Sequence, residues 1–178
     1  MLARRRSLPV TEVRSASTLI QQKFIGTGLL AKAKIIALYA PIYNEVDTAE
    51  VMHAALNAAK IVIFPAVCRS GLEFRRITNP AALQKGVFNI LEPDATCPVY
   101  SPEEADIIVV PGVSFDVCGR RIGYGKGYYD KSLHQLEGKG RMIGFCYDFQ
   151  LVDEITEEPH DVKMDTIITE RRIINLRY

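Results

Sequence analysis

Residues 107–113 read IIVVPGV: four β-branched apolar residues are followed by Pro-Gly and a further valine. A strand that is apolar at every position is typical of a parallel sheet buried on both faces. Other stretches that we interpret as strands or extended segments occupy residues 34–42, 61–67, 72–77, 141–147 and 165–176. Because helical patterns separate these runs, the sequence predicts a three-layer α/β/α fold, with a mainly parallel sheet and helices on both faces.

Helix signals lie between the strand-like runs. Apolar residues recur at helical spacing over residues 11–30, which predicts an amphipathic helix there. Asp47 and Glu50 are spaced like an N-cap residue and its N3 partner, and Ser101 with Glu104 repeats the pattern. Each pair predicts the start of a helix.

The composition is that of a globular domain. The chain has 178 residues, 48% hydrophobic and 24% charged, so we expect a single domain over residues 1–178. A net charge of +1 gives no general attraction to nucleic acid or membrane, and we expect neither as a partner. Without a membrane-length apolar run or a signal-peptide pattern, a cytoplasmic location is expected. The cysteines are dispersed without a CxxC pair, which argues against a zinc site and fits a reducing compartment.

A glycine-rich stretch, GYGKGYYD at residues 123–130, follows the strand at 107–113 by a short connection and runs into a predicted helix. Ligands of parallel α/β sheets bind beyond the carboxyl ends of the strands. Glycines let the backbone approach a ligand, amides at a helix start bind anions, and Lys126 adds a full positive charge. The spacing is GxGxG, which matches neither the Walker A loop nor the dinucleotide fingerprint. Two interpretations stay open, a phosphate-binding cradle and a glycine-rich turn with a solvated lysine.

Neighbouring residues also have a functional and a structural interpretation. Asp130 suits magnesium beside phosphates, but on local sequence it is more typical of an acid in the first turn of a helix. Tyr124 and Tyr128 offer flat faces for a heterocycle, whereas Tyr129 also suits core packing. Asp116 is interpreted as a turn-capping residue.

Other polar residues give weaker signals. Glu45 follows a predicted strand and can hold an amine or ring N–H of a ligand, or belong to an ordinary loop. The pair His160–Asp161 is more typical of a loop than of a site. His53 and His134 fall in predicted helices, and we assign them no chemistry.

Five stretches, taken in order, resemble one family: YAPIYNEVDT (39–48), ILEPD (90–94), ADIIVVPGVSFDVCGRRIGYGKGYYDKSL (105–133), IGFCYDFQLV (143–152) and PHDVKMDTIITE (159–170). Over about residues 6–170 the chain resembles the 5-formyltetrahydrofolate cyclo-ligases, also called 5,10-methenyltetrahydrofolate synthetases. The resemblance implies a NagB/RpiA/CoA transferase-like form of the α/β fold. It also implies ATP-dependent cyclisation of 5-formyltetrahydrofolate, with or without a polyglutamate tail, to 5,10-methenyltetrahydrofolate. ADP and phosphate would be released after phosphorylation of the formyl oxygen.

The resemblance also implies roles for matched positions. Lys126 would be the catalytic cation, and Asp130 and Asp161 would hold Mg²⁺. ATP would be bound by Arg121, Ile122, Gly123, Tyr124, Gly125, Lys126, Gly127, Tyr128 and Tyr129. Folate would be bound by Ala40, Glu45, Tyr124, Gly125, Lys126, Gly127 and Tyr128.

The beginning of the chain departs from the family pattern. Family members usually begin with a Lys-rich K-x-x-L-R segment that contacts ATP, whereas this chain begins MLARRRSLP. Three interpretations stay open: Arg4, Arg5 or Arg6 replaces that contact, the start of translation lies upstream, or nucleotide binding is weakened. Two further hypotheses stay open: a non-catalytic nucleotide- or folate-binding module, and an α/β enzyme for another phosphate-bearing metabolite. The sequence is compatible with a monomer or a homodimer.

Overall fold

The structure is a computed structural model that describes residues 1–69, 71–86, 89–133, 136, 140–156 and 161–176. The α-helices are α1 (Leu2–Arg6), α2 (Val10–Gly26), α3 (Leu29–Lys32), α4 (Ala49–Asn57) and α5 (Tyr128–Leu133). The first strands are β1 (Ile35–Ala37), β2 (Ile61–Cys68), β3 (Gly71–Ile77), β4 (Leu83–Lys85), β5 (Leu91–Pro93) and β6 (Val99–Tyr100). The others are β7 (Ile107–Val110), β8 (Ser114–Asp116), β9 (Arg121–Ile122), β10 (Arg141–Phe145), β11 (Leu151–Val152), β12 (Thr166–Ile168) and β13 (Ile173–Asn175).

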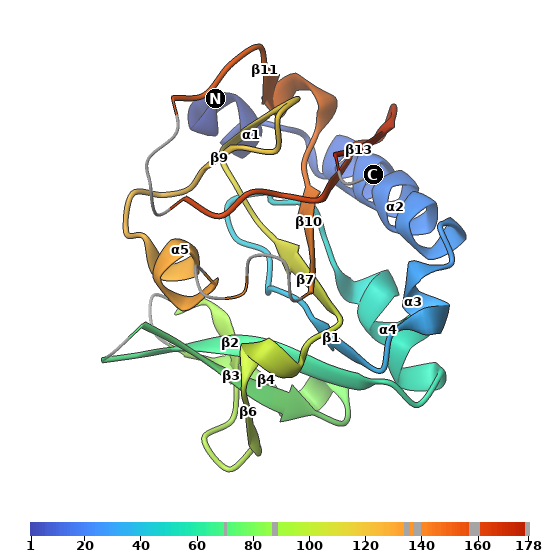
Figure 1. Cartoon of the computed structure of the whole chain (residues 1–178), viewed down its shortest axis with the longest axis vertical. Coiled ribbons are helices and arrows are strands. Elements are labelled where there is room, and N and C mark those ends of the chain that lie inside the picture. The colour runs from blue at the N-terminus through green and yellow to red at the C-terminus, as the bar shows by residue number, and fades with distance from the viewer. Residues whose placement is uncertain (70, 87–88, 134–135, 137–139, 157–160, 177–178) are drawn as a thin grey trace.

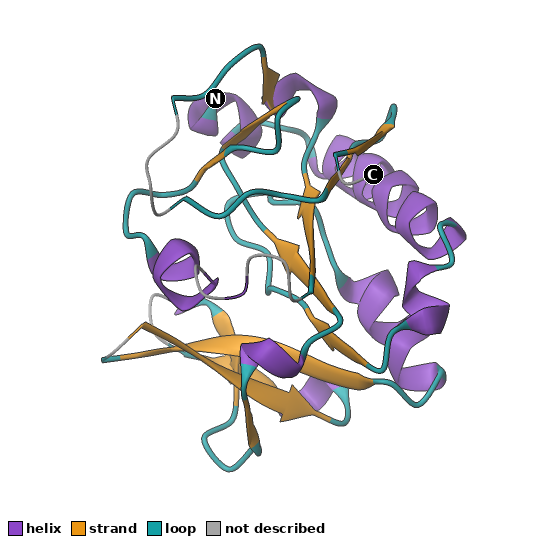
Figure 2. Cartoon of the chain, viewed as in Figure 1, coloured by secondary structure: helices purple, strands orange, loops and turns teal. Residues whose placement is uncertain are grey.

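One large sheet organises these elements (Figure 2). Its eight strands follow the order β13-β12-β10-β7-β1-β2-β3-β6. The five strands from β12 to β2 pair in parallel, and β13, β3 and β6 pair antiparallel at the two edges. The chain therefore has the expected mixed α/β fold, with the parallel strands at its centre.

The position of β7 in the sheet explains why its sequence is apolar throughout. All four of its residues are buried. Ile107 and Val109 pack in the core under α2 and α4, whereas Ile108 and Val110 pack in a second core with Leu133 of α5. Figure 1 shows α2, α3 and α4 along one side of the sheet and the short α5 on the other. Alternate side chains thus enter two separate cores, as a sheet covered on both faces requires.

The first long helix is shorter than the predicted 11–30. It ends at Gly26, and Gly28 adopts a left-handed backbone with φ of 72° before α3 begins. The Thr27 hydroxyl donates to the carbonyl of Phe24 at 2.6 Å, closing the last turn. The positive φ interrupts the helical hydrogen-bond series, so the periodic stretch forms two helices.

The start of α4 also differs from the prediction. Its N-cap is Thr48, not Asp47. The Thr48 hydroxyl donates to the carbonyl of Tyr39 at 2.7 Å, and Asp47 Oδ1 accepts from the amide of Ala49 at 2.9 Å. The predicted pairing of Asp47 with Glu50 is therefore wrong. By contrast, Ser101 and Glu104 form the predicted capping box, although the helix that follows is a single 3₁₀ turn.

Candidate functional site

A cavity of about 1050 Å³ lies beyond the carboxyl ends of β1 and β7 and beside the second half of β2. Its wall contains every matched position to which the family resemblance assigned ATP, folate or magnesium: Ala40, Glu45, the run 121–130 and Asp161. These positions come from three distant parts of the chain, and the fold brings them to one place. Their individual roles remain predictions.

The glycine-rich loop forms one wall of this cavity. Gly125 and Gly127 have φ of 81° and 63°, a conformation that favours glycine. Among the residues that the structure describes, no atom beyond the adjacent residues lies within 4 Å of the position where a Cβ of Gly125 would stand. Lys126 is exposed between them, with its Nζ 5.9 Å from the centre of the Tyr128 ring. The loop thus presents open backbone and a cation toward the cavity.

An ion pair lies beneath the loop. Arg121 Nη2 is 2.5 Å from Asp130 Oδ1, and Arg121 is 7% exposed. Its Nη1 reaches the carbonyl of Pro111 at 3.5 Å, whereas its buried Nε has no hydrogen-bond partner among the described residues. A metal ion on Asp130 therefore has to share this carboxylate with the guanidinium, or displace it.

Arg5 of α1 contacts the same loop at Tyr124. It is 1% exposed, and its Nη1 donates to the carbonyl of Gly112 at 2.8 Å. Its Nε donates to the carbonyl of Tyr43 at 3.1 Å, and its Nη2 donates to the hydroxyl of Tyr124. Arg5 is thus an interior residue that joins α1 to the turn after β7 and to the glycine-rich loop.

Glu45 completes this network. Its Oε1 accepts from the Tyr124 hydroxyl at 3.0 Å and lies 3.6 Å from Arg5, and its Oε2 accepts from the amide of Ile42 at 3.0 Å. Burial raises the pKa of the Glu45 carboxyl, while Arg5, the Ile42 amide and Tyr124 act in the opposite direction. Burial and the charge of Glu45 raise the pKa of Tyr124. Both Glu45 oxygens are therefore engaged by the protein itself.

The other two N-terminal arginines lie differently. The guanidinium of Arg6 stacks 3.9 Å from the centre of the Tyr43 ring, and both residues line the cavity. Arg4 lies 4.2 Å from the centre of the Phe149 ring, outside the cavity wall. Of the three candidates to replace the family's N-terminal contact, Arg6 is the one that lines the cavity.

The wall formed by β2, β3 and β5 was missed from the sequence. Its most unusual member is Glu92 of β5, 8% exposed, whose buried Oε1 has no hydrogen-bond partner among the described residues. The sequence stretch ILEPD pointed to this wall only as one piece of the family resemblance. Nothing local in it shows that the glutamate is buried.

The remaining polar candidates are the proposed metal ligands and the three histidines. The described residues contain no cluster of three or more His, Cys, Asp or Glu suited to a metal ion, so the pairing of Asp130 with Asp161 remains a prediction. His160 and His134 lie outside the described residues, and His53 is exposed on α4.

No described helix is long and apolar enough to span a membrane.

Asp116 is the turn-capping residue that the sequence predicted. It is fully buried and accepts from the amides of Cys118, Arg120 and Ile155, each at 2.9 Å. Burial alone would raise the pKa of its carboxyl, but these amides and the Arg120 side chain hold it below the usual value. Asp116 thereby fixes the turn that leads into β9 and the glycine-rich loop.

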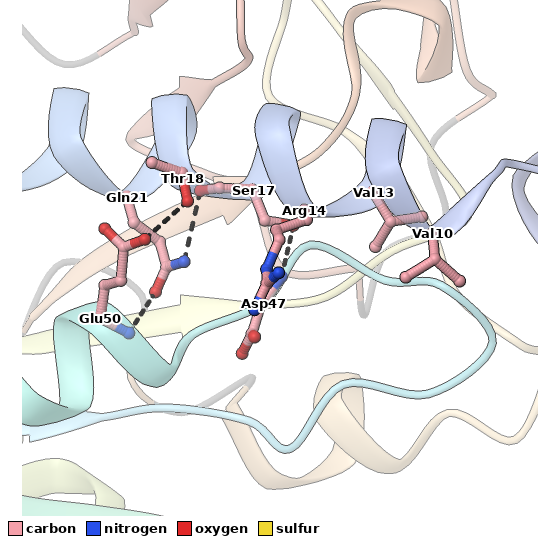
Figure 3. Close-up of a pocket in the computed structure, with 8 residues that line it drawn as sticks. All are labelled: Val10, Val13, Arg14, Ser17, Thr18, Gln21, Asp47 and Glu50. Atoms are coloured by element: carbon pink, nitrogen blue, oxygen red, sulfur yellow. Dashed lines mark hydrogen bonds between the residues drawn. The ribbon is translucent and has the colours of Figure 1, made fainter.

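A second cavity, of about 540 Å³, lies between α2 and the start of α4 (Figure 3). Gln21 Oε1 accepts from the amides of Glu50 and Val51 at 2.8 and 3.2 Å. The Thr18 hydroxyl donates to Glu50 Oε1 at 2.6 Å, and Ser17 Oγ accepts from the amide of Asp47 at 3.0 Å. These bonds join two helices, which is a structural role.

Comparison with known proteins gives one consistent family. The family model for 5-formyltetrahydrofolate cyclo-ligase matches residues 1–170. The chain is 30% identical to a 5-formyltetrahydrofolate cyclo-ligase of Mycolicibacterium smegmatis, over 99% of this chain and 94% of the relative. Among solved structures it is similar to a 5,10-methenyltetrahydrofolate synthetase of Aquifex aeolicus, with a TM-score of 0.89, 35% identity, and coverage of 99% of this chain and 89% of that one. A second, from Mycoplasma pneumoniae, has a TM-score of 0.76, 30% identity, and coverage of 95% and 93%.

Proposed function

The chain belongs to the 5-formyltetrahydrofolate cyclo-ligase family, and we propose that its large cavity binds ATP and 5-formyltetrahydrofolate together for the family's ring closure. The observation that carries the proposal is the family match over residues 1–170. The cavity volume of about 1050 Å³ supports it, because single small-molecule sites usually enclose roughly 300–1,000 Å³. Two ligands in contact need a site at the upper end of that range.

The chemistry requires that a poor leaving group become a good one. The formyl oxygen attacks the γ-phosphorus of ATP, and the bond from that phosphorus to the ADP oxygen breaks. N10 of the folate then adds to the formyl carbon and loses its proton, and the carbon–oxygen bond breaks to release phosphate. The protein contributes mainly position and charge stabilisation to such a transfer.

The cationic residues suit the phosphoryl transfer. Lys126 is exposed on a loop whose glycines admit a close ligand, so its charge can follow the transferred group. Arg121 contributes a fixed charge below the loop, and Arg6 extends the positive wall toward the N-terminus. The aromatic faces of Tyr124 and Tyr128, with Ala40 and Glu45, are assigned to the folate side.

Magnesium is the remaining part of the ATP site. Carboxylates beside phosphates are its usual protein ligands, and Asp130 and Asp161 both line the cavity. When bound, the ion would neutralise charge on the phosphates. Asp130 would meanwhile exchange part of its pairing with Arg121.

The proposal includes three finer expectations. The fold has the NagB/RpiA/CoA transferase-like layering, with α2 and α4 on one face of the sheet and α5 on the other. The protein acts in the cytoplasm as a monomer or homodimer. Its substrate includes polyglutamylated forms of 5-formyltetrahydrofolate.

The test is a reaction containing the protein, Mg-ATP and 5-formyltetrahydrofolate, followed by the absorbance of 5,10-methenyltetrahydrofolate. We expect one ADP for each product molecule and no product when ATP is omitted. Folate binding without ADP release would instead indicate a non-catalytic module. A thermal shift with sugar phosphates but none with folate would indicate an enzyme for another phosphate-bearing metabolite.

A further inference from the structure

Glu92 is a buried residue, and one of its carboxylate oxygens has no partner among the described residues. The residue is 8% exposed and lines the large cavity, and its Oε1 is buried without a hydrogen bond to any described residue. Taking an unpaired carboxylate out of water is strongly unfavourable. An unsatisfied buried group of this kind requires an explanation, and a ligand that supplies the missing donors is one.

The backbone around Glu92 is shaped to keep the carboxylate in place. β5 pairs antiparallel with β4, so that Glu92 lies opposite Gln84. The carboxylate folds over Gly86, where a Cβ would overlap with Glu92 Oε2. The backbone of Gly86 does not have a positive φ, so its lack of a side chain gives space to Glu92 and is not needed for the turn.

Glu92 differs in this respect from Glu45, the other buried glutamate of the cavity. Both oxygens of Glu45 accept hydrogen bonds from the protein, and Arg5 lies beside it. Glu45 can meet a ligand only if it gives up or shares these partners. Glu92 Oε1 accepts no hydrogen bond from the described residues, so a ligand's N–H group would displace no protein partner there.

The surroundings of Glu92 suit a flat ring. The other residues on this wall are mostly apolar and come from β2, β3, the start of β5 and the residue before it: Pro65, Val67, Leu72, Leu91 and Ile90. The cationic residues Arg121 and Lys126 belong to the glycine-rich wall instead. An anionic phosphate or glutamate tail would be repelled by Glu92, whereas a heterocycle with N–H groups would pair with it.

The hydrogen-bonding pattern separates the two heterocycles that the site must hold. A reduced pterin presents N3–H and its 2-amino group side by side, a pair of donors that matches the two oxygens of a carboxylate. Adenine presents one amino group flanked by ring acceptors, so a carboxylate would face a lone pair. We propose that Glu92 is a substrate-binding residue whose carboxylate accepts hydrogen bonds from N3–H and the 2-amino group of the pterin. This inference rests on the proposed function.

The first test replaces Glu92 by its amide. In Glu92→Gln we expect the KM for 5-formyltetrahydrofolate to rise about tenfold to a hundredfold, because one acceptor becomes a donor that faces the ligand's N–H. The kcat should stay within about threefold, and the KM for ATP should not change. The matched control is Glu73→Gln on neighbouring β3, a carboxylate that pairs with Arg75 and does not line the cavity. Equal KM values for folate in the Glu92 variant and wild type would overturn the proposal.

A stability measurement separates binding from a structural role. Removing an unpaired buried charge should leave the thermal midpoint of Glu92→Gln unchanged or raise it, while folate binding weakens. A lowered midpoint together with equal losses of ATP and folate affinity would mean that Glu92 supports the fold, and would overturn the proposal. Gly86→Ala displaces the carboxylate without removing it, and should raise the folate KM in the same direction.

The decisive experiment pairs the variant with a substrate analogue that lacks the 2-amino group. By equilibrium binding, wild type should bind this analogue about tenfold more weakly than 5-formyltetrahydrofolate, and Glu92→Gln should bind the two about equally. Losses that simply add would show that residue and amino group do not interact, and would overturn the proposal. Because binding is measured without turnover, this result stands apart from the proposed function, which fails separately if wild type forms no methenyl product.

Discussion

The two cavities differ in how their buried polar groups are satisfied. Between α2 and α4, the side chains of Ser17, Thr18 and Gln21 hydrogen-bond with the segment that starts α4 (Figure 3). In the large cavity, Glu92 Oε1 and Arg121 Nε are buried without a partner, and they are the two such side-chain atoms in the described part of the chain. Because native proteins satisfy almost all buried polar groups, this difference distinguishes a ligand site from a helix joint.

The same difference predicts how substitutions will act. A change in the large cavity should lower activity with little loss of stability, because its polar groups are arranged for a ligand. A change in the α2–α4 cavity should lower stability and leave the kinetic constants alone. Four variants test this division. A large loss of stability from a change in the large cavity, or altered kinetic constants from a change in the α2–α4 cavity, would contradict it.

Lys126→Ala has the largest expected effect. Removing a cation from a transferring phosphoryl group costs on the order of a thousandfold in kcat/KM. The thermal midpoint should stay near that of wild type, because Lys126 is exposed and its replacement leaves no core cavity. Lys131→Ala, an exposed lysine of the adjacent α5 that does not line the cavity, is the control and should be nearly neutral. Near-wild-type activity of the Lys126 variant would show that the glycine-rich loop is misassigned.

Gln21→Ala should give the largest loss of stability among these variants. Gln21 is 2% exposed, and its Oε1 accepts from two amides in the first turn of α4. Without it those amides lose their acceptor, at a cost of about 2 kcal/mol in unfolding free energy. Urea unfolding measures this value, with exposed Gln22→Ala as the control. A raised folate KM in a fully folded Gln21 variant would contradict the division.

Asp130→Asn should change the dependence on magnesium. If Asp130 holds the ion, the Mg²⁺ concentration for half-maximal rate should rise about tenfold, since a neutral amide is a weaker ligand. Asp153→Asn, at an exposed position outside the cavity, serves as the control. An unchanged magnesium titration would leave Asp130 with its ion pair to Arg121 as its whole role.

The sequence indicated which segments line the large cavity, but it did not indicate the hydrogen bonds and ion pairs among them. The run 107–113 correctly indicated a strand buried on both faces, because burial of both faces leaves a direct mark in residue type. The residues that the family resemblance assigned to ligands line one cavity, and their individual roles stay predictions. Pairing between distant residues leaves no such mark. Arg5 bonds to Gly112 and Tyr124, 107 and 119 positions away, so a basic N-terminus gave no sign that this arginine would be interior.

Local patterns failed where a single backbone angle or an absent partner decided the outcome. The periodicity of residues 11–30 continued through Gly28, and the positive φ that divides the helix is not visible in apolar spacing. Aspartate is a favoured residue type at N-caps, but Thr48, not Asp47, occupies that position. The Thr48 hydroxyl donates a hydrogen bond to the carbonyl of Tyr39. The burial of Glu92 could not be predicted from local sequence either, because the missing partner of its Oε1 depends on residues that are near it only in the folded chain.

Thr18→Ala has the smallest expected effect on the free energy of unfolding, and it tests a single hydrogen bond of the α2–α4 cavity. Its hydroxyl donates to Glu50 Oε1 at 2.6 Å, and both residues are partly buried. The loss should be about 0.5–1 kcal/mol, below that of Gln21→Ala, because the Glu50 carboxylate reaches solvent and can be hydrated. Thr18→Ser keeps the hydroxyl and should recover most of the difference in chemical unfolding. A loss that serine does not recover would assign the effect to the methyl group and to packing, and the joint between α2 and α4 would then be apolar in origin.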